Sequence, residues 1–121
     1  MLNGFSEQTQ PLTEYENNVI LPVVIQGLMQ KVGRSHAVTN SHICLCLKHR
    51  GFKATEPRIR KVINHIRTNG LVIGLIATSE GYYIAQSKYE IDEYLESLRG
   101  REQAIRAVRM SLERQRDNMY G

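Results

Sequence analysis

The stretch TEPRIRKVINHIRTNG, residues 55–70, carries the signals of one complete helix, from its first residue to its last. Thr55 is a preferred N-cap, and Pro57 falls in the first turn, where proline is tolerated. Gly70 is the residue type that most often ends a helix. The aliphatic side chains recur at the spacing of a single helical face: Ile59, Val62, Ile63 and Ile66. The stretch therefore predicts an amphipathic helix with one face in a core.

The other sides of this helix are predicted to be polar and basic. They carry Arg58, Arg60, Lys61, Asn64, His65, Arg67 and Thr68. The chain of 121 residues has a net charge of +4, but residues 34–70 alone hold eight cations against Glu56. Residues 71–98 hold one cation and five anions. A basic segment of this kind indicates a polyanionic partner for one region of the protein.

The flanking sequence predicts two helices before the stretch and a β-hairpin after it. TEYE at residues 13–16 is a capping box that opens a helix running to about Lys31, and Pro22 either kinks this helix or marks its true start. TNSHICLCLKHRG at 39–51 predicts the second helix, with Ile43, Cys44 and Leu47 inward. LVIGLIATSEGYYIA at 71–85 is β-branched around a polar turn, as in a hairpin.

A second capping box, SKYE at residues 87–90, opens a long C-terminal helix in which Gly100 is expected to cause a bend or a split. Apolar residues recur in it every seven positions, and this stripe either covers the domain's own core or pairs two chains. Polar Arg101 and Gln115 at core positions argue against a long two-stranded coil. We expect a homodimer, through Leu98, Ile105, Val108 and Leu112.

The order of these elements defines the expected fold class: mainly α with a β-hairpin wing, a winged helix-turn-helix followed by a long C-terminal helix. We expect a mobile N-terminal segment over residues 1–12, because it is polar and aperiodic. The winged helix-turn-helix domain is then expected over residues 13–87, and the C-terminal helix over 88–121.

Residues 37–85 resemble the DNA-binding domain at the start of biotin protein ligase repressors, and more closely the short winged-helix proteins of phages and mobile elements. The shared pattern falls on Ile63, Ile66, Arg67, Gly70, Gly81, Tyr82 and Ile84. No biotin chemistry is implied, because the ligase's catalytic domain is absent. The wing tip ATSEG departs from the usual pattern, since it carries Glu80 and no cation.

The expected function is sequence-specific binding of double-stranded DNA by a transcriptional regulator or replication accessory of phage or mobile-element origin. The predicted contact residues are Lys53, Thr55, Arg58, Arg60, Lys61, Asn64, His65 and Thr68. In this interpretation the cations bind phosphate or guanine, and Asn64 reads adenine. The alternative is a winged-helix module that binds another protein, which the acidic wing tip and the acidic start of the last helix leave open.

Other function classes find little support in the sequence. No phosphate-binding glycine loop, paired carboxylates or nucleophile–base motif indicates an enzyme or a bound cofactor. His42, Cys46 and His49 share a helical face, but a fourth zinc ligand has no source. Cys44 and Cys46 are expected to be free thiols, and no segment is apolar enough to span a bilayer or to act as a signal peptide. We therefore expect a cytoplasmic protein without a metal ion.

Overall fold

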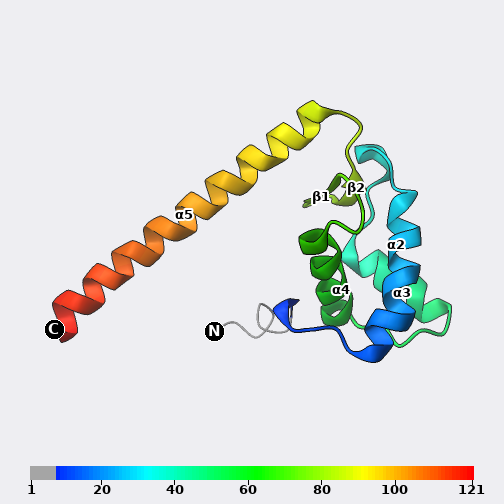
Figure 1. Cartoon of the computed structure of the whole chain (residues 1–121), viewed down its shortest axis with the longest axis horizontal. Coiled ribbons are helices and arrows are strands. Elements are labelled where there is room, and N and C mark those ends of the chain that lie inside the picture. The colour runs from blue at the N-terminus through cyan, green and yellow to red at the C-terminus, as the bar shows by residue number, and fades with distance from the viewer. Residues whose placement is uncertain (1–7) are drawn as a thin grey trace. The chain divides into compact units, whose positions relative to one another are not determined.

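The computed structural model describes residues 8–121 and divides the chain into two units, an N-terminal unit that ends at Gln86 and a C-terminal unit, Ser87–Gly121 (Figure 1). The chain is mainly helical, with one two-stranded antiparallel hairpin. The elements of the N-terminal unit, in chain order, are η1 (Glu16–Ile20), α2 (Leu21–Met29), η2 (Arg34–His36), α3 (Asn40–His49), α4 (Glu56–Asn69), β1 (Leu75–Thr78) and β2 (Gly81–Ile84).

The first helix begins at the predicted capping box. The backbone N–H of Thr13 donates to Glu16 Oε1 at 2.8 Å, and the N–H of Glu16 donates to Thr13 Oγ1 at 3.2 Å. The backbone is helical from residue 14 to residue 29, so Pro22 does not mark its start. The π-helical turn η1 directly precedes α2, in which Pro22 lies in the first turn. A proline ring crowds the carbonyl group four residues earlier in an α-helix. The π-helical turn is wider than an α-helical turn, so it leaves room for the ring of Pro22.

Helices α3 and α4 begin and end where the sequence predicts. Thr39 Oγ1 accepts the N–H of His42 at 3.1 Å, and Thr55 Oγ1 accepts the N–H of Arg58 at 3.3 Å. Gly70 ends α4 in the left-handed conformation, with φ of 63°. Each cap satisfies a backbone group that the helix itself leaves unpaired.

The hairpin is tied to the segment before α3 by a short bridge. In the hairpin, Leu75 pairs with Ile84 and Thr78 with Gly81. Val38 and Tyr82 exchange two backbone hydrogen bonds, of 3.0 and 2.8 Å. A Cβ atom on Gly81 would lie 2.5 Å from the carbonyl oxygen of Val38, so only glycine fits at this crossing. The hairpin is shorter than the apolar stretch 71–85, because residues 71–74 form a turn.

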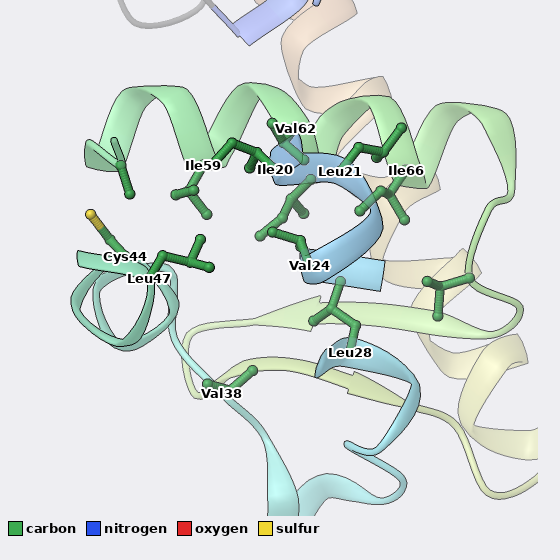
Figure 2. Close-up of a cluster of buried hydrophobic side chains, with 13 residues drawn as sticks. Ile20, Leu21, Val24, Leu28, Val38, Cys44, Leu47, Ile59, Val62 and Ile66 are labelled. Atoms are coloured by element: carbon green, nitrogen blue, oxygen red, sulfur yellow. The ribbon is translucent and has the colours of Figure 1, made fainter. Parts of the chain in front are cut away.

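The core lies where α2, α3 and α4 meet (Figure 2). The predicted apolar face of α4 is confirmed, since none of its four aliphatic residues exceeds 1% exposure. Of the expected inner face of α3, Cys44 and Leu47 are buried and Ile43 is half-buried. Helix α2 contributes Leu21, Val24 and Leu28. Burying one such aliphatic side chain contributes about 1.5–3 kcal/mol, so this cluster fixes the orientation of α4.

The C-terminal unit is one helix, α5 (Lys88–Tyr120). Ser87 Oγ accepts the N–H of Glu90 at 3.2 Å, which confirms the predicted cap. The helix continues through Gly100 without a split. Across residues 8–121, no helix combines the length and the apolar character needed to span a membrane.

Candidate nucleic-acid interface

The solvent side of α4 divides into an open flank and a covered flank. On the open flank Pro57, Arg60, Arg67 and Thr68 are exposed. On the covered flank Arg58, Lys61, Asn64 and His65 are half-buried. Both flanks carry residues predicted to contact DNA, but only the open flank presents its side chains to solvent as expected.

A buried carboxylate explains much of the covered flank. Glu16 is only 2% exposed, although it is the first residue of η1. Its carboxylate accepts Arg58 Nε at 2.9 Å and lies 2.6 Å from Lys61 Nζ. Two of the predicted DNA-contacting cations are therefore already paired within the fold. Burial offsets part of the attraction, but removing Glu16 would leave two cations unpaired in a poorly hydrated site.

The same contacts determine the protonation state of Glu16. Burial alone raises the pKa of Glu16, whereas hydrogen bonds from Lys61, from the Thr13 backbone and from Arg58 lower it. The net effect is a pKa below the ordinary value, so the carboxylate remains charged. The cluster is thus an ion triad of one anion and two cations at neutral pH.

The segment before the first helix also lies on the covered flank. We call residues 8–13 the strap. Lys61 Nζ donates to the carbonyl oxygen of Pro11 at 3.4 Å, and Asn64 Nδ2 donates to that of Gln8 at 3.3 Å. Leu12 packs against the hydrophobic core. The prediction of a mobile segment over residues 1–12 falls partly on residues 1–7, which lie outside the described residues.

The loop before α4 is held to the first helix as well. The backbone N–H of Lys53 donates to the hydroxyl of Tyr15 at 2.9 Å, and its carbonyl accepts Arg58 Nη1 at 2.8 Å. The guanidinium of Arg58 lies 5.4 Å from the centre of the Tyr15 ring, within cation–π range. The side chain of Lys53 remains exposed, and Thr55 next to α4 is exposed too. These two predicted contact residues are accessible.

The polar residues near the end of α4 bond to their own helix. Thr68 Oγ1 donates to the carbonyl of Asn64 at 2.9 Å, and Asn69 Nδ2 donates to that of His65 at 2.9 Å. Such bonds from side chain to backbone are common for short polar residues. The structure therefore gives Thr68 an exposed position with its hydroxyl proton already engaged.

The wing tip carries a paired acid. Glu80 accepts Arg34 Nε at 2.9 Å and Arg34 Nη2 at 3.1 Å, in a bidentate pair between the turn of the hairpin and η2. The Arg34 guanidinium lowers the pKa of the Glu80 carboxyl. The sequence showed an acidic tip without a cation, and the fold supplies one from residue 34.

The exposed face of α3 carries His42 and Cys46, which are candidate metal ligands by residue type. Cys46 Sγ lies 3.5 Å from His42 Nε2, one turn away on the helix. Within the described part of the chain, no three histidine, cysteine or acidic side chains come together in a way that could hold a metal ion. Cys44 and Cys46 are both free.

Sequence reasoning missed the role of Glu16 and of the strap. A signal for Glu16 was present, because it lies four residues before the buried Ile20 on the inward side of the first helix. An acid at a core-facing helical position needs a cationic partner. The strap gave no such signal, because it accepts the bonds from Lys61 and Asn64 through backbone carbonyls, which every residue has.

Comparison with known proteins adds no family to this geometry. No family model, curated protein or solved structure matches the chain. The case for a function therefore depends on the residues and their arrangement alone.

Proposed function

We propose that the N-terminal unit is a winged helix-turn-helix that binds double-stranded DNA, with α4 as its recognition helix. The order of three helices followed by a hairpin supports this fold, and so does the isolated bridge from Val38 to Tyr82, which ties the hairpin to the segment before α3. The second helix of a helix-turn-helix pair enters the major groove, and α4 is that second helix.

The open flank of α4 is the observation that carries the proposal. Arg60 and Arg67 lie two helical turns apart on one exposed side. The only acid of α4, Glu56, accepts the hydroxyl of Ser41 at 2.6 Å at the helix start. Lys53 extends the exposed positive charge into the preceding loop. This distribution suits contacts to phosphates and to guanine on a groove-sized helix.

The proposed DNA binding also indicates a biological role for the protein. A small basic domain of this kind serves as a transcriptional regulator or a replication accessory, and its specificity comes from side chains that reach base edges. Helix α5, taken by itself, presents an apolar stripe on which Ile105 is 70% and Leu112 58% exposed. We propose that this stripe pairs two chains into a homodimer, so that two α4 helices read two half-sites.

Replacing Arg60 by alanine tests the proposal. We expect duplex affinity to fall, with the salt dependence of binding reduced by about one unit for the lost phosphate contact. Fluorescence anisotropy with a labelled duplex measures both. Arg106→Ala removes the same charge from an exposed position of α5 and should leave affinity nearly unchanged. Equal behaviour of the two variants would show that α4 is not the contact surface.

The alternative function is a protein-binding module. The observation in its favour is the pair of Arg34 and Glu80, which neutralises a cation beside the wing. A wing used on DNA generally offers its cations to phosphates. The same anisotropy assay separates the two functions, because a protein-binding module shows no salt-dependent affinity for duplex.

A further inference from the structure

The covered flank of α4 holds the residues best placed to read bases, and they are occupied by the chain itself. The N-terminal half of a recognition helix usually contacts the base edges. In α4 this half includes Arg58 and Lys61, and Asn64 lies just beyond it. The side chains of these three residues are bonded to Glu16, Pro11 and Gln8, respectively. DNA that approaches α4 along this flank meets the strap first.

We propose that the strap, residues 8–13, is an autoinhibitory cover of the recognition helix, which withholds Lys61 and Asn64 from DNA until it is displaced. This inference rests on the DNA-binding function proposed above. The strap competes through the same chemistry as DNA. Its backbone carbonyls accept from the lysine and the asparagine, as phosphate oxygens and base edges would.

The attachment of the strap is weak enough to reverse. The bonds from Lys61 to Pro11 and from Asn64 to Gln8 are long, at 3.4 and 3.3 Å, and the donors lie at a partly exposed surface. Leu12 is only partly buried against the core. The capping box of Thr13 and Glu16 lies at the junction between the strap and the helix. The cover can therefore open at Gln8–Leu12 while the first helix stays folded.

Opening of the strap changes the apparent affinity of the protein for duplex DNA by an amount that can be calculated. If the binding-competent state is only a fraction of the population, the apparent dissociation constant rises in inverse proportion to that fraction. Replacing Leu12 by serine removes the apolar anchor without changing the net charge. Since half the burial of a leucine is at stake, we expect duplex affinity to rise about five- to tenfold.

The test compares Leu12→Ser with wild type and with Leu45→Ser in the anisotropy assay. Leu45 is a 54% exposed leucine on α3 and serves as the matched control. The expected result is tighter binding by Leu12→Ser alone, because opening the strap frees Asn64 from the carbonyl of Gln8. Equal affinities of all three overturn the strap but leave DNA binding intact. Absence of binding by all three overturns both proposals.

A second variant tests whether the Glu16 carboxylate, next to the strap, also withholds cations of α4 from DNA. Glu16→Gln releases Arg58 and Lys61 from the carboxylate, while Glu14→Gln makes the same charge change at an exposed position of the same helix. We expect the salt dependence to steepen by about two units more for Glu16→Gln than for Glu14→Gln. Equal salt dependence of the two glutamine variants contradicts the withholding of these cations.

Discussion

The ion triad of Glu16, Arg58 and Lys61 makes a quantitative prediction about stability. Glutamine at position 16 keeps the size of the side chain and an acceptor for the Thr13 backbone, but loses the charge. Breaking a buried ion pair by removing one partner costs about 3–5 kcal/mol. The side chains of Arg58 and Lys61 retain 29% and 13% exposure, so both cations recover some hydration. We therefore expect Glu16→Gln to lower the free energy of unfolding by about 2–3 kcal/mol.

Urea unfolding followed by circular dichroism at pH 7 measures this loss. The control is Glu14→Gln on the same helix, which is exposed and should stay within about 0.5 kcal/mol of wild type. The slope of the unfolding free energy against urea should not change, because both variants keep the fold. If the two variants have the same stability, the reasoning about a buried triad is refuted.

The pH dependence of stability gives an independent check of the direction in which the Glu16 pKa is shifted. Because the folded-state pKa of Glu16 lies below its ordinary value of 4.5, its contribution is fully present above that value and is lost as pH falls through the folded pKa. Glutamine does not titrate. The stability difference between wild type and Glu16→Gln should therefore shrink as the pH is lowered below about 5. A difference that stays constant under acid would contradict the assignment.

Two further predictions concern the hairpin and the C-terminal helix. Gly81→Ala should destabilise the protein by about 2–4 kcal/mol in urea unfolding, because a Cβ there meets backbone. Gly51→Ala, at a positive φ of 86° but with open space around it, should cost only about 1–2 kcal/mol, and equal losses would show that the crossing is not tight. Ile105→Lys should convert a dimer into a monomer in sedimentation equilibrium at about 10 µM protein, whereas Ala107→Lys, on the opposite side of α5, should not. A monomeric wild type at this concentration would exclude the homodimer.

The local features of the fold could be predicted because their signals lie close together in the sequence. The caps at Thr39, Thr55 and Ser87 each need only a residue three positions later. The buried face of α4 needs only the helical period. These features follow from short-range geometry, so one sequence is enough to find them.

The covered flank could not be predicted for the opposite reason. Glu16 and Arg58 are 42 positions apart, and nothing in the helical period of either segment links them. Lys61 and Asn64 bond to backbone carbonyls, which every residue possesses. A helical wheel places both residues outward, but it does not show that another part of the chain occupies the outside. The sequence thus predicted the helix and its buried face, while the accessibility of the polar residues depended on tertiary contacts.

The most direct test of DNA binding is a titration of the wild-type chain against a labelled duplex at several salt concentrations between about 50 and 200 mM. The exposed cations of α4 and the preceding loop include Lys53, Arg60 and Arg67. With each phosphate contact contributing about 0.9 to the slope, the logarithm of the association constant should fall against the logarithm of salt with a slope of about −2 to −4. Absence of saturable binding at the lowest salt, or an affinity that does not change with salt, would contradict the proposal that this protein binds DNA through α4.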